Sequence, residues 1–249
     1  MKMVLPVAAL VAVTLAVPAM AVVPNFSETF ENGVQSSVWT PWAGSNQYLF
    51  NTAGPDIWKN HTPGGVYSAR VDAANPAAFN GTADFGAYNG NIWADVWVFE
   101  DHDYTGANPV TNMLCLIGDN GTSIASFAKD YLQVGAVSFW PGGSANYGAR
   151  SMNGGMLNFG DSRKKGWTHL AIQADSLANG GQVRYYIDGT QYGTGQRSAE
   201  YLRWVRVGNN SYSYENFWYD DVRVVVPEPS ALLALGTGLV GLIGLRRKS

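Results

Sequence analysis

The residues that could do acid–base chemistry gather around one apolar, aromatic run. Glu100-Asp101-His102-Asp103 follows directly on Ile92–Phe99, and Asp95 lies within that run. Glycoside hydrolysis needs two carboxyl groups about 5–9 Å apart, one as the acid and one as the base or nucleophile. Asp95 and Glu100 are five positions apart, so they would project from opposite faces of a regular strand. We expect a solvated loop after a strand, with a diverged acidic site of a glycan-active hydrolase or lyase as the alternative.

Tryptophans of the same run could contact a sugar without cleaving it. If Ile92–Phe99 is a strand, Trp93 and Trp97 share one face with Asp95 and Phe99, because strand side chains alternate. Flat aromatic rings beside polar side chains suit stacking on sugar rings, with hydrogen bonds to the hydroxyl groups. We therefore predict Trp93 and Trp97 as ligand-binding residues, although most aromatic residues of this chain must belong to a core.

The remaining reactive side chains indicate no further chemistry. His169, two positions after Trp167, is expected to be a packed or hydrogen-bonded core histidine. Cys115 lies in the apolar run Met113–Ile117 and is predicted to be a buried small hydrophobe. A single cysteine excludes an intramolecular disulfide framework, and the sequence has no serine nucleophile elbow, phosphate loop or dinucleotide fingerprint. We predict no catalytic residue.

The elements that must position these residues read as one all-β domain from Val22 to Val226. No apolar pattern keeps a helical period over three turns, and short β-rich runs alternate with Gly, Asn, Asp and Pro clusters. The expected strands are Val66–Val71, Ile92–Phe99, Met113–Ile117, Tyr131–Phe139, Trp167–Gln173, Gln182–Ile187, Tyr201–Val207 and Asn216–Val226. The clearest hairpin turns at Asp188-Gly189. Many short strands without helices predict a sandwich or jelly roll.

The order of motifs in the second half resembles the laminin-G-like, concanavalin A-like jelly-roll superfamily. The resemblance rests on a W-x-H strand at Trp167, a Y-Y-I-D-G hairpin, a V-R-V-G strand and a closing D-D-V-R-V strand. The opening from Phe26 to Gly33 is similar to the first strand of these domains. The superfamily includes lectins, carbohydrate-binding modules, glycanases and adhesion domains, so the fold alone does not choose a function. Its glycanases typically carry E-x-D-x-x-E on one strand, a spacing that this chain lacks.

The same resemblance implies one structural Ca²⁺ that ties the first strand to the last. The matching positions are Glu31 and either Asp220 or Asp221. In a regular strand Asp220 shares a face with Val222, where a carboxylate must be neutralised, paired or metal-bound. Carboxylate oxygens suit calcium, so the predicted metal ligands are Glu31 and Asp220. The simpler interpretation is a turn-capping Glu31 and a surface arrangement of Asp221 with Arg223.

The N-terminal residues 1–21 are expected to be a secretory signal peptide. Lys2 supplies a positive start, Val4–Val17 is almost entirely apolar, and Ala19 and Ala21 are the small residues that a signal peptidase reads. The mature chain would then begin near Val22. An N-terminal anchor helix is the alternative.

The C-terminal residues 227–249 have three parts in a fixed order. Pro227-Glu228-Pro229 is followed by the apolar run Ala231–Leu245 and then by three basic residues. This order resembles the PEP-CTERM sorting tail, which implies a Gram-negative envelope protein that an exosortase processes and that is often associated with exopolysaccharide. As a helix the run would rise about 22 Å, less than a ~30 Å hydrocarbon core, which favours a transient inner-membrane anchor. An unprocessed C-terminal anchor is the alternative.

Charge narrows the set of partners. Between the two ends the chain carries 12 basic and 18 acidic residues, a balance that disfavours nucleic acid and anionic lipid. We therefore expect an exported, non-catalytic protein that binds, or is embedded in, extracellular polysaccharide of the outer envelope or matrix. Its other expected contacts are an exosortase and, through the C-terminal helix, the membrane. A structural adhesion domain without a glycan ligand is a further alternative.

Overall fold

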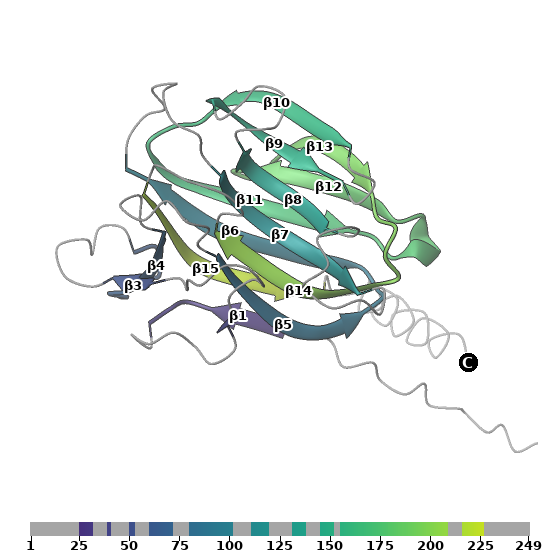
Figure 1. The fold of residues 1–249 in the computed structure, drawn as a ribbon, viewed down its shortest axis with the longest axis horizontal. Helices are drawn as coiled ribbons and strands as arrows, with labels where there is room; N and C mark the ends of the chain where they lie inside the picture. The colour runs from purple at the N-terminus through teal and green to yellow at the C-terminus, as the bar shows by residue number, and fades with distance from the viewer. Residues whose placement is uncertain are drawn as a thin grey trace, which may run out of the picture.

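The computed structural model describes residues 25–31, 39–40, 50–52, 60–71, 80–101, 111–119, 131–137, 145–151, 155–208 and 216–226. Within these ranges the chain forms two antiparallel sheets packed face to face (Figure 1). The all-β prediction is confirmed, and the architecture is consistent with a jelly-roll sandwich. The expected signal peptide and sorting tail lie outside the described residues, and no helix inside those ranges is long and apolar enough to cross a membrane.

The first sheet, sheet A, has eight strands. They are β1 (Asn25–Glu28), β3 (Phe50–Thr52), β4 (Ser68–Val71), β6 (Ile92–Glu100), β11 (Gly166–Ala174), β12 (Gln182–Ile187), β13 (Thr190–Gln196) and β15 (Phe217–Val225). Their order is β13-β12-β11-β6-β15-β4-β3. β15 is central, because β6 pairs with one of its sides while β4 and β1 share the other.

The second sheet, sheet B, has seven strands in the order β10-β9-β8-β7-β14-β5-β2. They are β2 (Trp39–Thr40), β5 (Asn80–Tyr88), β7 (Thr111–Asp119), β8 (Tyr131–Val137), β9 (Asn146–Arg150), β10 (Met156–Ser162) and β14 (Tyr201–Gly208). A short 3₁₀ helix, η3 (Leu177–Asn179), lies between β11 and β12.

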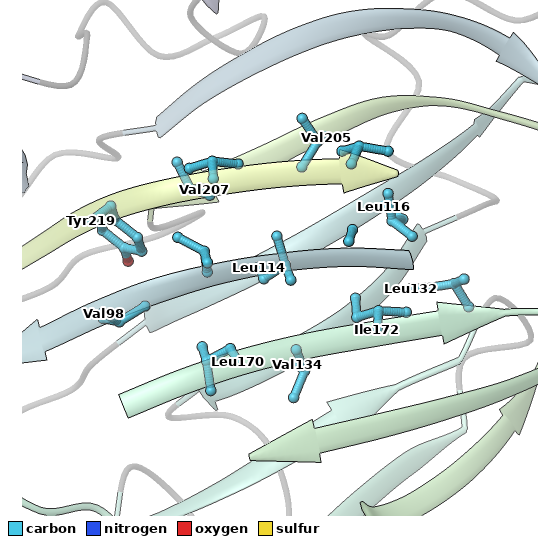
Figure 2. Packing of buried hydrophobic residues seen from close by; sticks show 14 of the residues in the cluster. Val98, Leu114, Leu116, Leu132, Val134, Leu170, Ile172, Val205, Val207 and Tyr219 are labelled. Carbon is cyan, nitrogen blue, oxygen red and sulfur yellow. The ribbon is translucent and has the colours of Figure 1, made fainter. Parts of the chain in front are cut away.

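Apolar side chains from the facing sides of both sheets form the core (Figure 2). In β6 the inward residues are Ile92, Ala94, Val96 and Val98, each at most 1% exposed. The alternation of β6 therefore turns Trp93, Asp95, Trp97 and Phe99 to the outer face, as the sequence predicted.

The predicted hairpin joins β12 to β13. Asp188 and Gly189 have φ values of 49° and 78°, the positive values that a tight two-residue hairpin turn requires. Ile187 pairs with Thr190 across this turn. The interpretation of the Y-Y-I-D-G segment as a hairpin is confirmed.

β15 contains a bulge that a regular alternation does not predict. Between Asp220 and Arg223, three steps along β15 match two steps along β6, and Asp221 has a φ of 49°. The extra residue reverses the alternation, so Val222 rejoins Tyr219 in the core while Asp220 stays on the outer side. The expectation that Asp220 and Val222 share a face was wrong for this reason.

Candidate functional site

The outer face of sheet A carries a band of aromatic side chains, which we call the aromatic face. Cross-strand pairing builds it, because Trp97 pairs with His169 and Phe99 pairs with both Trp167 and Trp218. Its members are Trp93, Trp97, Phe99, Trp167, His169, Tyr186 and Trp218.

Trp93 lies beside Tyr186 of β12. The two half-buried rings have their centroids 5.2 Å apart and their planes inclined by 46°. The Tyr186 hydroxyl donates to Gln173 Oε1 over 2.9 Å, and Gln173 pairs with Trp93 across β11 and β6. Arg184 on the same side of β12 contacts both oxygens of Asp175 at 3.1 Å. This end of the face combines two inclined rings with an amide and an ion pair.

Trp97 has a different environment from Trp93. The His61 ring stacks on its indole with centroids 4.0 Å apart and planes 15° apart, and the His169 ring lies 4.8 Å away. The structure therefore brings the two predicted tryptophans to one face, but packs Trp97 against two imidazoles. Their role in ligand binding stays a prediction.

Asp95 is the buried charge of the aromatic face, with 1% of the residue exposed. Its oxygens accept hydrogen bonds from Arg223 Nε at 3.0 Å and from Arg223 Nη2 at 2.5 Å, and Oδ2 lies 3.1 Å from His169 Nε2. Burial alone would raise the pKa of Asp95, but hydrogen bonds from His169, Arg223 and Trp93 lower it below its usual value. Asp95 is thus ionised at neutral pH and unsuited to be a general acid.

Glu100 lies on the opposite side of β6, between the sheets. It accepts hydrogen bonds from Tyr147 Oη at 2.9 Å and from Arg163 at 2.9 and 2.6 Å. As predicted, Asp95 and Glu100 face opposite ways, and an arginine binds each of them. They cannot flank one glycosidic bond. Asp101 follows Glu100 and is half-buried, while residues 102 and 103 of the acidic run lie outside the described ranges.

Glu31 joins the two ends of the turn formed by residues 60–67. Its oxygens accept from Val66 N at 2.8 Å, from Tyr67 N at 3.3 Å and from Asn60 Nδ2 at 2.6 Å. The preceding Phe30 is buried with a φ of 59°, an unusual conformation for a bulky residue. That backbone places Phe30 in the core and leaves Glu31 to cap the turn.

Asp220 binds residues 61 and 62 near the start of the same turn and is fully buried. It accepts from His61 N at 2.7 Å, from Thr62 N at 3.1 Å and from Asp221 N at 2.8 Å. Burial raises the pKa of Asp220 to about 6, although these backbone hydrogen bonds oppose the shift. The carboxylate of Asp221 lies 2.7 Å from His61 Nδ1 and accepts a hydrogen bond from Thr62 Oγ1 at 2.8 Å. Asp221 and Asp220 together thus place His61 over Trp97.

The surroundings of Glu31 have features that fit a hard cation. Asn60 Oδ1 is buried and accepts no hydrogen bond from a described donor. A Cβ on Gly65 would lie 2.1 Å from Glu31 Oε1 and 2.7 Å from Asn60 Oδ1, so both oxygens face the bare Gly65 Cα. Oxygen ligands of this kind suit calcium. In the ranges that the structure describes, no group of three or more His, Cys, Asp or Glu side chains could hold a metal ion.

The other sequence expectations have mixed outcomes. His169 is hydrogen-bonded and packed, as predicted, but it lies on the outer face with 15% of its side chain exposed. Cys115 is fully buried, and burial raises the pKa of its thiol, as expected of a small hydrophobe. Arg223 forms its hydrogen bonds with Asp95, whereas the simpler interpretation had placed it with Asp221.

Two residues of the site were not identified from the sequence. Tyr186 could have been assigned to the outer side from the alternation of the hairpin, since Tyr185 is in the core. Its position beside Trp93 depends on the strand order β12-β11-β6, which no local pattern contains. His61 reaches Trp97 through a turn that is bound to a strand about 160 residues later.

Solved structures with the same fold share little sequence with this chain. The globular domain of T. cruzi calreticulin is 13% identical, with a TM-score of 0.55, and 88% of this chain and 94% of that one are covered. The cellulose-induced protein Cip1 is also 13% identical, with a TM-score of 0.53 and coverage of 81% and 97%. A sialidase is 10% identical, with a TM-score of 0.50, and the match spans 84% of this chain but only 19% of the sialidase.

No curated protein matches this chain in sequence. A family model does match at the C-terminus, where residues 225–248 fit the PEP-CTERM protein-sorting motif. The match includes Pro227, Glu228 and Pro229, the residues predicted to form the sorting box. The chain therefore joins a PEP-CTERM sorting motif at residues 225–248 to an all-β domain of two antiparallel sheets, consistent with a jelly-roll sandwich.

Proposed function

We propose that this chain is an exported cell-envelope protein that binds extracellular polysaccharide through the aromatic face of sheet A and does not cleave it. The PEP-CTERM motif supports export and sorting by an exosortase. Within the envelope of a Gram-negative bacterium, the C-terminal apolar segment anchors the chain in the inner membrane until the tail is processed. The protein then belongs to the outer envelope or the extracellular matrix.

The single observation that carries the binding proposal is the Trp93–Tyr186 pair beside Gln173. The two half-buried, inclined rings suit stacking on the apolar face of a sugar ring. The neighbouring amide suits hydrogen bonds to the sugar hydroxyl groups. Trp97 belongs to the same predicted site, and its imidazole neighbours restrict it to an edge contact or a supporting role.

The charges around this pair favour an uncharged sugar. Arg184 is matched by Asp175, and Arg223 is matched by Asp95. Both guanidinium groups are already neutralised, so they provide no excess positive charge to select an anionic glycan. We therefore infer a neutral polysaccharide as the ligand.

Affinity electrophoresis of the purified protein against a panel of neutral and acidic polysaccharides tests this function. We expect retardation by a neutral polymer without release of product. Trp93→Ala and Tyr186→Ala should each weaken binding about ten-fold, as expected for the loss of one stacking contact. Phe159→Ala is the matched control, because Phe159 stacks on Tyr192 at 5.6 Å away from the aromatic face.

The other outcomes separate the alternatives. Release of soluble sugars would show that the protein is a glycan-cleaving enzyme. If no polymer retards the protein, the remaining alternative is a structural adhesion domain without a glycan ligand. Equal weakening by Phe159→Ala and Trp93→Ala would move the binding site away from the aromatic face.

We also propose that the 60–67 turn holds one structural Ca²⁺ between Glu31 and Asp220, with Asn60 Oδ1 as a further ligand. The ion would supply positive charge among the oxygens of Glu31, Asn60 and Asp220 and tie the segment after β1 to β15. Support comes from the buried Asn60 oxygen and from the cradle over Gly65. Chelation should then lower the melting temperature, and Asn60→Asp should raise the calcium affinity. An unchanged melting temperature would mean that the N–H donors of the turn alone neutralise the two carboxylates.

A further inference from the structure

A row of residues that contains Trp93 crosses six strands of sheet A. Backbone pairing joins its members in one line, because each of them is the direct partner of the next. In order from β13 to β1 they are Thr194, Arg184, Gln173, Trp93, Val225 and Asn25. Directly paired residues project from the same face of a sheet, so these side chains share the outer face with Trp93.

A second row lies beside the first, at the next outward-facing position of each strand. In the same order its members are Gln191, Tyr186, Ala171, Asp95, Arg223 and Ser27. The Trp93–Tyr186 ring pair therefore joins the two rows near their middle. Neighbouring strands lie about 4.8 Å apart, so each row is about 24 Å long.

Both rows are open at their two ends. Gln191 and Thr194 are exposed on β13, and Asn25 and Ser27 are exposed on β1. These side chains are amides and hydroxyl groups, which donate and accept hydrogen bonds without carrying a charge. A chain of sugar rings stacked on the ring pair can therefore continue in both directions over neutral hydrogen-bonding groups.

The direction along β6 is closed by the 60–67 turn. Trp97 is the next outward residue of β6 after the two rows, and its indole packs against the rings of His61 and His169. The turn that carries His61 lies on the outer side of β15, where it donates backbone hydrogen bonds to the fully buried Asp220. A ligand that followed β6 from the ring pair would meet this cluster, so a long ligand must cross the strands instead.

We propose that the outer face of sheet A binds an internal segment of a linear, neutral polysaccharide that crosses the strands from β13 to β1, with the Trp93–Tyr186 pair near its centre. This assignment rests on the proposed function and adds the direction and the length of the bound segment. With about one ring for each strand spacing, a row of ~24 Å holds about five sugar rings. Thr194 and Asn25 bind the outermost rings, and no chain end is needed for binding.

An oligosaccharide series tests the length of the bound segment. Affinity electrophoresis first compares a neutral linear glucan, xylan and mannan. Isothermal titration calorimetry of the purified protein then uses the oligosaccharides, from disaccharide to octasaccharide, of the polymer that retards the protein most. We expect the affinity to rise at least ten-fold from the disaccharide to the hexasaccharide and then to level off. A disaccharide that binds as tightly as the octasaccharide would overturn this assignment, while retardation by the polymer would still support the proposed function.

The number of protein molecules bound to each polymer chain distinguishes internal segments from chain ends. A linear chain has only two ends, so a site for internal segments should load a long chain with more than two protein molecules. Calorimetry with a polymer of known chain length measures this loading. Saturation at one or two protein molecules per chain would overturn the assignment of an internal segment.

Substitutions at the two ends of the first row test the direction of the ligand. Thr194→Ala and Asn25→Ala should each weaken octasaccharide binding about three- to ten-fold, as expected for one lost hydrogen bond, and leave disaccharide binding unchanged. Thr190→Ala is the matched control, because Thr190 is also exposed on β13 but pairs with the core residue Ile187.

The outcomes of these substitutions separate the two proposals. Full octasaccharide affinity in both end variants, or equal weakening by Thr190→Ala, would overturn the crossing direction and leave the proposed function standing. If none of the three polymers retards the wild-type protein, the proposed function and the crossing segment are both wrong.

Discussion

His61 lies flat on Trp97, with ring centroids 4.0 Å apart and planes inclined by only 15°. The contact exists because Asp220 and Asp221 hold the turn that carries His61. His169 contacts the same indole from β11. Trp97 therefore packs against two imidazoles, whereas Trp93 packs against the ring of Tyr186.

Replacement of these two tryptophans should separate stability from binding. Trp97→Ala removes an indole that packs against two imidazoles, so the free energy of unfolding should fall by about 2–4 kcal/mol. Trp93→Ala removes a hydrogen bond to the buried Asp95 carboxylate, so it should cost about 1.5–3 kcal/mol and, unlike Trp97→Ala, weaken polysaccharide binding about ten-fold. Urea unfolding at neutral pH gives the two stabilities, and affinity electrophoresis gives the two affinities. Equal weakening of binding by the two substitutions would contradict this assignment.

Asp95→Asn should make stability less dependent on pH in acid. Because hydrogen bonds lower the pKa of Asp95 in the folded protein, the ionised carboxylate stabilises the fold above the unfolded value of about 3.9. That stabilisation is lost as the pH falls through the folded value.

The difference between the wild type and Asp95→Asn should be about 2 kcal/mol at pH 7 and should shrink below about pH 4. Denaturation curves between pH 7 and pH 3 measure it. Asp84→Asn is the control, since its partner Arg203 forms an exposed pair worth at most about 1 kcal/mol. A difference that stays constant with pH would show that Asp95 is not the titrating group.

Arg197 should be among the most sensitive arginines of the described domain. Arg197 is only 3% exposed. Its guanidinium donates hydrogen bonds to the backbone oxygens of Ala199, Gly90 and Asp175 at 2.8–3.3 Å. Burial lowers its pKa to about 10, so it is still charged at neutral pH. Arg197→Lys keeps the charge but cannot reach these carbonyls in several directions at once.

We expect Arg197→Lys to lower the free energy of unfolding by about 2–3 kcal/mol, because buried carbonyl groups lose their donors. Thermal unfolding compares it with Arg203→Lys, whose ion pair with Asp84 is exposed and should matter by less than about 1 kcal/mol. Equal effects of the two substitutions would show that the carbonyl contacts contribute little.

Gly65→Ala should open the turn that Glu31 caps. The new Cβ would lie 2.1 Å from Glu31 Oε1, closer than two non-bonded atoms can approach, so the carboxylate must move away. We expect a loss of about 1–3 kcal/mol, the usual range for overpacking. Gly155→Ala is the control, because a Cβ on Gly155 would approach no atom of the described residues closer than Ser151 Oγ at 3.2 Å.

A double-mutant cycle isolates the cause of the Gly65 effect. In a Glu31→Ala background the clash with Glu31 is absent and the 2.7 Å approach to Asn60 Oδ1 remains. Gly65→Ala should then cost at least 1 kcal/mol less, within the coupling range of contacting residues, about 0.5–3 kcal/mol. Chemical denaturation of the four proteins gives the coupling. Additive effects would mean that the turn tolerates a side chain at position 65 without Glu31 moving.

Strand alternation, a local property, was enough for part of the site. The period of two along β6 put Trp93, Asp95 and Trp97 on one face and Glu100 on the other before any partner strand was known. The Asp188-Gly189 turn was equally local, since positive φ values at two residues define it. The sorting motif was likewise readable from contiguous residues.

The local sequence of some strands did not predict a strand. β5 and β10 contain turn-forming residues such as Asn80, Gly86 and Gly160, and they were not expected as strands. β5 pairs with β14 and β2, and β10 pairs with β9. Pairing with neighbouring strands outweighed the composition, as is usual for the context-dependent β propensity.

The environment of the site was decided by contacts between distant parts of the chain. The bulge at Asp221 coincides with the docking of the 60–67 turn on Asp220, more than 150 residues away in sequence, and it changed which residues Asp220 faces. Sheet order likewise brought Tyr186 to Trp93 and Arg223 to Asp95. Residue spacing determines from which side of a strand a side chain projects. Only the folded sheet determines which charged groups and aromatic rings that side chain contacts.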